Sequence, residues 1–504
     1  MENYALHHSP RTYNEGAEMK RETNSKDIIV RMRDRIPGST KISYGLGTAL
    51  DMWGFWLYPG VAFAVFNIYL GVDPWLVGLA LTLIRIYDAI SDPIAGWISD
   101  NFRSRFGRRR PFILIAGVLA GLGLPALFLV SPSWTNHSFL GLSSVFWYMM
   151  GSSLVYIPIM AMYTVPYNSL GAEMTPDYEE RTSVMTYKGS MQKIFEVANF
   201  YALRFTNLSW FLLPGTVVGK NTLAGMQVYS CILGSLMALF SITIFFRVKE
   251  RYYEKVVVKT KERISLKASL YETLKCKPFR VIMGYGAMFT LSTSMVGSLG
   301  YYATVYYVCG GNTINGDNWN FWMGVAFMIG GFFGAPLLGL VARATQKKTA
   351  VMVAASIGIM GYGGSWFLYT PAIPWLQTIA SGIMGLAAAG LWMLHGSIGA
   401  DVIDYDELTM GIRREGSFTA CGSYVLKLGN SMGGFVAGLI LGRSGFNSIL
   451  GAQSPNTIFW IRAMLASIPV VGLFGVILII SKLDLTKKRC EDIRTELEAR
   501  RGNV

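Results

Sequence analysis

The chain carries little charge for its length. Aspartate, glutamate, lysine and arginine make up 15% of its 504 residues, whereas 52% of the residues are hydrophobic. Soluble domains contain about 25% charged residues. Apolar stretches of about 20 residues, long enough to cross a hydrocarbon core of roughly 30 Å, recur along the sequence. These properties exclude an ordinary soluble protein and predict an integral membrane protein.

Three further patterns are absent. The apolar stretches do not alternate with polar residues, as the short strands of a membrane β-barrel do. The five cysteines have neither a CxxC nor a Cys/His spacing, so they indicate no disulfide framework and no metal site. The first forty residues contain no apolar region of a cleavable signal peptide. We therefore expect an all-α membrane protein whose first crossing acts as its own insertion signal.

Lysine and arginine are scarce in every second loop. They gather before residue 42, at 103–110, 247–280 and 343–348 and after residue 481, whereas the loops between carry only Lys220 and Arg443. Cytoplasmic loops are the positive ones, so this asymmetry predicts cytoplasmic termini and an even number of crossings. It explains the net charge of +14 by topology rather than by nucleic-acid binding. We expect a multi-pass protein in the lipid of the plasma (cytoplasmic, or inner) membrane.

Twelve apolar segments can be counted between these loops. They lie near residues 43–70, 74–99, 111–131, 142–172, 183–206, 226–246, 279–308, 319–342, 348–370, 374–402, 416–442 and 458–481. A long basic linker divides them into six and six. The predicted parts are a cytoplasmic N-terminal tail (1–42), a six-helix bundle (43–246), a cytoplasmic linker (247–278), a second six-helix bundle (279–482) and a cytoplasmic C-terminal tail (483–504).

A weak internal repeat supports this division. The stretch "DPIAGWISDNFRSRFGRRRPFILIAGV" from Asp92 resembles "APLLGLVARATQKKTAVMVAASIG" from Ala335, with a basic turn followed by an apolar helix in both. Two parallel six-helix halves are the architecture of the major facilitator superfamily. The predicted fold is therefore all-α, with twelve transmembrane helices in two six-helix bundles.

Two aspartates lie one helical turn apart inside an apolar segment. Asp88 and Asp92 are spaced i, i+4, and Arg85 precedes Asp88 by three residues, so all three share one helix face. Ionised side chains in a membrane segment mark a functional site by default. Two carboxylates in a low dielectric raise each other's proton affinity or attract a cation together, which makes them a candidate cation site. The alternative is that they neutralise arginines of the following loop.

Longer motifs in both halves resemble those of one transporter family. "RIYDAISDPIAGWISDNFRSRFGRRRPF" from Arg85, "MYTVPYNSLGAEM" from Met162, "ERTSVMTYK" from Glu180 and "GLWMLHGSIGADVIDYDE" from Gly390 are similar to the glycoside–pentoside–hexuronide:cation symporters, the family of the melibiose permease. The resemblance implies a major facilitator fold and cation-coupled uptake of a sugar, glycoside or uronide. It also implies that Asp88 and Asp92 are the carboxylates of the cation site.

The same resemblance implies a sugar-binding role for four positions. Asp51 matches an aspartate that receives sugar hydroxyls, and Lys188 stands at or next to a sugar-binding arginine. Trp392 matches a tryptophan that stacks on the glycosyl ring. Lys427 matches a lysine between the sugar and cation sites. Charge-assisted bonds to hydroxyls and an indole against a pyranose face suit these roles.

Two pocket positions depart from the melibiose permease. Thr164 replaces an aspartate that serves cation and sugar together, and Asn168 replaces a tryptophan, so melibiose is not expected as the substrate. Sodium needs several oxygen ligands, whereas a proton needs one carboxylate of raised proton affinity. We expect H⁺ to be the coupling ion, carried mainly by Asp88 with Lys427 and Thr164 as its neighbours, and Na⁺ at Asp88 and Asp92 is the alternative. Thr164 is expected at both the cation and the sugar site, and Asn168 at the sugar site. An acidic sugar is slightly favoured over a neutral one.

Charged residues at the cytoplasmic ends of the helices predict an ion-pair lock between the halves. Such a lock would hold one access state and open in the other. Its predicted members are Asp100, Arg103, Arg105, Arg108, Asp401, Asp404 and Arg413.

The expected function is secondary active transport by alternating access, not enzymatic catalysis, with no cofactor apart from the coupling ion. An intramembrane aspartyl protease also needs two aspartates, but from two different helices rather than one. A lysolipid carrier of the related branch is a further alternative, which the polar residues Asp51, Lys188 and Lys427 disfavour. The expected partners are a sugar and membrane lipid, with no nucleic acid, and a monomer suffices.

Overall fold

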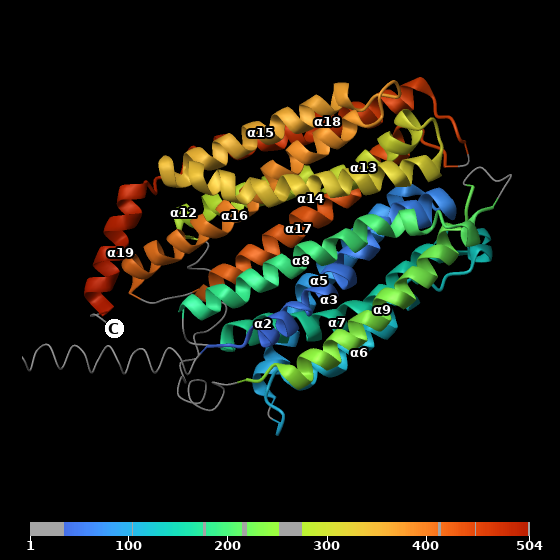
Figure 1. The fold of residues 1–504 in the computed structure, drawn as a ribbon. Helices are drawn as coiled ribbons and strands as arrows, with labels where there is room; N and C mark the ends of the chain where they lie inside the picture. Colours follow the sequence, from blue (N-terminus) through green and yellow to red (C-terminus); the bar gives the residue numbers. More distant parts are fainter. Residues whose placement is uncertain are drawn as a thin grey trace, which may run out of the picture.

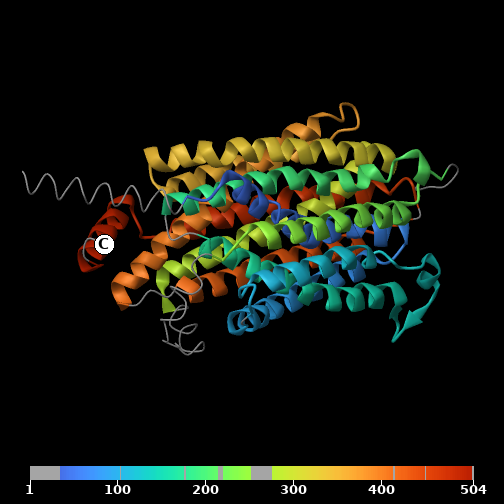
Figure 2. The same cartoon turned by 60° about the horizontal axis from the view of Figure 1, so that its bottom comes forward.

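The computed structural model describes residues 35–102, 104–174, 178–213, 219–250, 275–411, 415–448 and 450–501. They form an elongated bundle of long helices that run along a common axis, with α19 (Lys487–Arg501) at one end (Figure 1). In the described part of the chain the only sheet is a hairpin of β1 (Ser138–Phe139) and β2 (Leu142–Ser143). This hairpin projects from the end opposite α19 (Figure 2). The predicted all-α class is confirmed.

The N-terminal half begins with one long helix built from five pieces. These are α2 (Gly38–Gly45), α3 (Thr48–Met52), η1 (Trp53–Leu57), α4 (Tyr58–Ala62) and η2 (Phe63–Tyr69). The following helices are α5 (Pro74–Asn101), α6 (Arg110–Ala126), α7 (Ser144–Glu173), α8 (Tyr178–Phe205) and α9 (Thr222–Arg247), with short 3₁₀ turns η3 (Pro132–Asn136) and η4 (Ser209–Phe211).

The C-terminal half has the same succession of long helices. They are α12 (Lys277–Ser294), α13 (Val296–Tyr302) and η6 (Ala303–Val308) in one run, then α14 (Thr313–Ala344), α15 (Lys347–Leu368), α16 (Leu376–Met410), α17 (Glu415–Arg443) and α18 (Pro455–Ile480). The observed bounds lie within a few residues of most predicted ones. The largest difference is at α16, which continues eight residues beyond the predicted 402.

Nine helices in the described residues are long and apolar enough to cross a membrane. Three other stretches run beside them. Helix α6 has 17 residues, α8 carries several charged and amide side chains, and α12 is interrupted after 18 residues. A multi-pass membrane protein is thus confirmed, while the count of twelve crossings stays a prediction.

Local sequence signals set many of the helix ends. A side-chain oxygen of Ser143, Asn221, Asn312 or Ser454 accepts a hydrogen bond from a backbone amide in the first turn of α7, α9, α14 or α18. Such capping satisfies donors that have no partner inside the helix. At the other end of α16, Gly411 adopts a φ of 73°, which glycine takes without steric cost.

The first helix contains two π-helical turns, η1 and η2. Pro59 follows η1 and has no amide hydrogen to donate to the carbonyl of Phe55, four residues earlier. This carbonyl is therefore open to a side-chain donor from a neighbouring helix. Sites of this kind are common where a membrane helix carries function.

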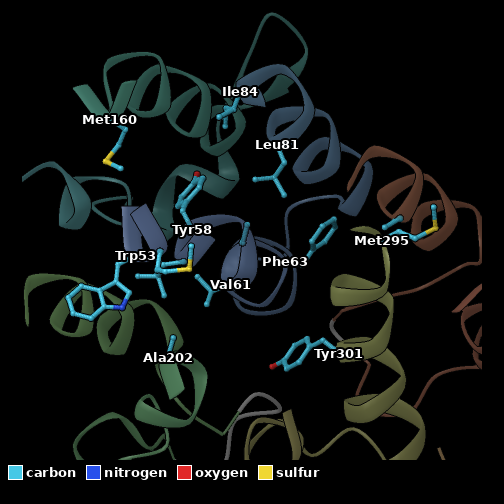
Figure 3. Packing of buried hydrophobic residues seen from close by; sticks show 14 of the residues in the cluster. Trp53, Tyr58, Val61, Phe63, Leu81, Ile84, Met160, Ala202, Met295 and Tyr301 are labelled. Carbon is cyan, nitrogen blue, oxygen red and sulfur yellow. The ribbon is translucent and has the colours of Figure 1, made fainter. Parts of the chain in front are cut away.

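Aromatic and sulfur-containing side chains of several helices converge around the first helix. Trp53, Tyr58 and Phe63 of that helix, Leu81 of α5 and Met160 of α7 lie in this buried cluster (Figure 3). Because large side chains fill the centre of the N-terminal half, its helices are fixed relative to one another.

The two halves meet where α5 packs on α17 and where α8 packs on α14. The α5–α17 contact is made by backbone. A Cβ atom added to Gly78 would lie 2.7 Å from the carbonyl oxygen of Gly434, and one added to Gly438 would lie 2.5 Å from that of Pro74. Small residues permit such close approach of membrane helices.

Candidate functional site

The two aspartates of α5 lie against a lysine from the other half. Lys427, near the middle of α17, places its Nζ atom 2.5 Å from Oδ2 of Asp92 and 2.9 Å from Oδ2 of Asp88. The Asp88 side chain is fully buried, whereas those of Asp92 and Lys427 are 32% and 25% exposed. Among the described residues the partners of the two aspartates, Lys427 and Arg85, lie within the bundle, which disfavours the alternative that the aspartates only neutralise loop arginines.

Arg85 completes the charged face of α5. Its Nη1 atom lies 3.6 Å from Oδ2 of Asp88, and its Nη2 atom donates a 2.9 Å hydrogen bond to the carbonyl of Phe55. This is the carbonyl that Pro59 leaves without an α-helical partner. The guanidinium also lies 5.2 Å from the ring centroid of Trp56. The missing amide hydrogen of Pro59 thus leaves a carbonyl that helps to hold Arg85 beside Asp88.

Two buried carboxylate oxygens of this cluster, Oδ1 of Asp88 and Oδ1 of Asp92, have no hydrogen-bond donor. The neighbouring ammonium lies on the Oδ2 side of both carboxylates, 2.9 Å from Oδ2 of Asp88 and hydrogen-bonded to Oδ2 of Asp92. Buried acceptors without donors are costly, and a proton or a cation is the species that would satisfy them.

Asp51 joins this cluster from the first helix. It lies in α3, and its carboxylate interacts electrostatically with Arg85, Asp92, Lys188 and Lys427. Four elements, α3, α5, α8 and α17, therefore contribute to one set of charges. The structure thus brings Asp92, Lys188 and Lys427 within electrostatic reach of Asp51, while their roles in binding stay a prediction.

Lys188 of α8 lies against the end of α7. Its Nζ atom donates a 2.6 Å hydrogen bond to Oδ1 of Asn168 and lies 5.3 Å from the ring centroid of Tyr167. Tyr167 is stacked between Tyr44 and Tyr163. Asn168 thus holds the lysine in place through its amide oxygen.

The remaining two predicted pocket residues have other surroundings. Trp392 of α16 is 44% exposed, and its ring meets those of Phe289 and His395 edge to face, with centroids 5.4 and 6.4 Å away. Thr164 is buried, and its hydroxyl donates to the carbonyl of Met160 in its own helix. The indole of Trp392 is therefore only partly covered by other side chains, whereas the hydroxyl hydrogen of Thr164 is already used.

The cytoplasmic lock is described only in part. The backbone amides of Arg108, Arg109 and Arg110 donate to the carboxylate of Glu250, and Asp401 pairs with Lys347 at 2.5 Å. Neither contact joins the two bundles, because Glu250 follows α9 of the first half, whereas Lys347 and Asp401 both belong to the second half. Arg105 stacks its guanidinium over Phe106, with 4.7 Å to the centroid, and Asp404 is half-buried.

The other proposed members of the lock are Arg103, Arg413 and the side chain of Asp100, which fall outside the described residues. The lock between the halves therefore stays a prediction.

A buried network at the end opposite α19 was not predicted from the sequence. Lys220, in the loop before α9, forms an ion pair with Asp317 of α14 and donates to the hydroxyl of Thr206 and the amide oxygen of Asn207. Tyr301 donates a 2.7 Å hydrogen bond to the other oxygen of Asp317. Burial lowers the pKa of Lys220, so the adjacent carboxylate is needed to keep the ammonium charged.

A second bond joins the halves near this network. The hydroxyl of Tyr302 donates to the amide oxygen of Asn67, whose amide nitrogen donates to the carbonyl of Val72. Both partners are buried. Two buried polar contacts, Lys220–Asp317 and Tyr302–Asn67, thus join the two halves at this end of the bundle.

A bundle of membrane-length helices with a buried charge cluster between two halves is the construction of a membrane transporter. The profile of the MFS/sugar transport protein family matches residues 43–487, and the chain belongs to this family. The predicted symporter resemblance and the expectation of a transporter rather than an enzyme are confirmed at this level.

Individual relatives agree with this placement. The chain is 26% identical over 482 residues to the glucuronide carrier protein homolog of Escherichia coli (strain K12), covering 93% of this chain and 97% of that protein. It is 25% identical over 470 residues to the isoprimeverose transporter of Lactiplantibacillus pentosus, covering 90% of each. The crystal structure of a mutant nucleoside transporter, NupG, aligns with a TM-score of 0.62 at 13% identity, covering 87% and 98% of the two chains, and shows the shared fold.

Proposed function

We propose that the protein is a sugar symporter in which a cation bound by Asp88 and Asp92 drives uptake. The observation that carries this proposal is the contact of Lys427 with both aspartates. Through this contact the protonation or cation binding of Asp88 and Asp92 in the first half affects how strongly α17 of the second half is held against α5. Neutralising the aspartates weakens this contact. The names of the relatives, which refer to a glucuronide and to isoprimeverose, support a sugar or glycoside as substrate.

The sugar site in this proposal lies beside the cation site. Asp51 and Lys188 bind hydroxyl or carboxylate groups, Asn168 orients Lys188, and Trp392 stacks on the sugar ring. Lys427 lies between the two sites and senses both, while Thr164 contributes its oxygen to their shared wall. Binding of either ligand then favours the other, as reciprocal coupling requires.

Transport proceeds by alternating access. The termini lie in the cytoplasm of a cell whose plasma membrane holds the protein, so the buried Lys220 network closes the extracellular end. The halves 43–246 and 279–482 rock about their contact, and the cytoplasmic lock forms when the extracellular network opens. A monomer contains every element of this cycle.

The proton is the proposed coupling ion. The ammonium of Lys427 already holds the place between the aspartates that a sodium ion would need. A proton on Asp88 or Asp92, by contrast, satisfies an acceptor that now has no donor and releases the lysine. Sodium at the same carboxylates is the competing assignment.

Uptake by reconstituted protein tests the proposed function. Purified protein in lipid vesicles is given a panel of labelled pentosides, hexosides and uronic acids, with an imposed pH or sodium gradient. We expect accumulation of at least one sugar above its equilibrium level, lost in Asp88→Asn/Asp92→Asn. Accumulation of lysolipid instead of any sugar, or uptake indifferent to every cation gradient, would overturn the proposal.

A further inference from the structure

A second charged pair lies farther along α8. Lys193 and Glu196 form an ion pair with 2.7 Å between Nζ and Oε2, and their side chains are 43% and 20% exposed. They follow Lys188 by five and eight residues, which is about 7.5 and 12 Å along a helix axis. This distance is more than one sugar ring covers, so the pair is separate from the contacts of Lys188.

The pair faces the interface between the halves. Phe200 follows Glu196 by four residues and Lys193 by seven, which places all three on one face of α8. At Phe200 this face touches α14 so closely that a Cβ atom on Gly324 would lie 2.2 Å from its ring. One turn farther on, the guanidinium of Arg204 lies 4.8 Å from the centroid of Phe321 on the same helix.

Exposure of the pair indicates where the helices separate. Phe200 is packed against α14, whereas Lys193, two turns nearer to α19 on the same face, is 43% exposed. The two helices therefore leave the charged pair accessible from the α19 end. Ile194, on another side of α8, is 59% exposed and serves as a reference position away from this face.

A purely structural role accounts poorly for these two charges. An exposed i, i+3 ion pair contributes little to stability. Ionisable groups at membrane depth, in contrast, are costly and mark ligand pathways. Together the two side chains offer a charged donor beside a charged acceptor with no net charge. This combination matches the hydroxyl groups of an uncharged sugar, each of which both donates and accepts.

We propose that Lys193 and Glu196 form a second sugar subsite, which binds the hydroxyls of an uncharged second ring while the first ring lies between Asp51 and Lys188. The inference rests on the proposed sugar transport and makes its substrate a two-ring glycoside. A first ring with a carboxylate fits the same arrangement, because Lys188 and Lys427 lie on the side of the first ring.

Binding of matched one-ring and two-ring sugars tests the subsite. Calorimetry on the purified full-length protein compares xylose with xylobiose, glucose with cellobiose, and glucuronic acid with glucuronosyl-xylose. For a pair that binds, we expect the two-ring sugar to bind at least tenfold more tightly. In Lys193→Met/Glu196→Met this advantage disappears, whereas affinity for the one-ring sugar changes less than twofold.

Three variants serve as controls. Ile194→Ala retains the full preference, Lys188→Met weakens both ligands, and the exchanged pair Lys193→Glu/Glu196→Lys keeps most of the preference because a donor and an acceptor remain. If the double methionine variant is unfolded, loss of the preference in the folded single variants Lys193→Met and Glu196→Gln decides instead.

The outcomes separate the two proposals. Equal binding of one-ring and two-ring sugars by the native protein, or an undiminished preference in the variants, overturns the subsite and leaves sugar transport standing. Equal losses for both ligands would also overturn it, by showing a structural role. Failure of every sugar to bind would overturn both proposals.

Discussion

Lys220 and Asp317 form an ion pair that joins the two halves of the chain, with side chains only 2% and 0% exposed. The two residues are 97 positions apart in sequence. Their other hydrogen-bond partners come from the end of α8, the turn that follows it, and α13. Removing one partner of such a pair strands a buried charge, which typically costs about 3–5 kcal/mol.

The first prediction concerns this closed end. Asp317→Asn leaves Lys220 buried without a carboxylate, so the closed state loses stability relative to the open one. We expect Cys309, a half-buried thiol at the end of η6, to react several-fold faster with an impermeant maleimide, as measured by mass spectrometry. Lys220→Met/Asp317→Leu, which removes both charges, should react nearly as slowly as the native protein. Equal rates in all three proteins would contradict the gating role.

A second prediction concerns the sugar contacts. Asp51→Ala and Trp392→Ala should each weaken sugar binding tenfold or more, about 1.4 kcal/mol, because each removes a direct contact. Calorimetry on folded variants provides the measurement, and Trp322→Ala, at a 50% exposed ring of α14, is the aromatic control. Unchanged affinity in a folded Asp51→Ala variant would remove that residue from the pocket.

The charge of the site predicts its preference among sugars. Asp51, Asp88 and Asp92 are balanced by Arg85, Lys188 and Lys427, so the described cluster is neutral. Without Arg85 the net charge of the other five side chains is −1. The structure adds the arginine to the cluster because its guanidinium contacts Asp88. We expect uronic acids to bind at least as well as their neutral counterparts in competition assays. Binding of neutral glycosides alone would refute this expectation.

The coupling ion can be identified in vesicles. A pH gradient in sodium-free buffer should drive uptake, and Asp88→Asn should abolish it, since the amide cannot take up the proton. Asp73→Asn, at an exposed residue just before α5 and outside the cluster, is the matched acid-to-amide control. Uptake that stays flat until sodium is added would reject the proton and assign Asp88 and Asp92 as sodium ligands.

Local patterns in the sequence predicted the helices and the face that bears Asp88 and Asp92. Apolar length and the i, i+4 spacing are properties of single segments, so they can be read without a structure. The convergence of Asp51, Lys188 and Lys427 was available only through family motifs, because contacts between distant helices leave no periodic signal.

Lys220 shows what such patterns miss. As a lone lysine in an otherwise uncharged loop, it was interpreted as an exception to the charge asymmetry. Its carboxylate partner, Asp317, lies near the start of α14 in the other half of the chain. The sequence contains no sign of that pairing. The bond from Arg85 to the Phe55 carbonyl was hidden for a different reason, since it depends on a π-helical turn that hydrophobic periodicity does not reveal.

The backbone contact between α5 and α17 leaves no slack for an extra carbon atom. A Cβ on Gly78 or Gly438 meets carbonyl oxygens and Cα atoms rather than movable side chains. One methyl group at either position would therefore push α5 and α17 apart at their contact. Because both glycines lie near the Lys220 end of the bundle, the added methyl group would keep the two halves separated at that end. Gly78→Ala thus offers a way to trap the shape that is open at the Lys220 end for imaging, with no inhibitor or antibody needed.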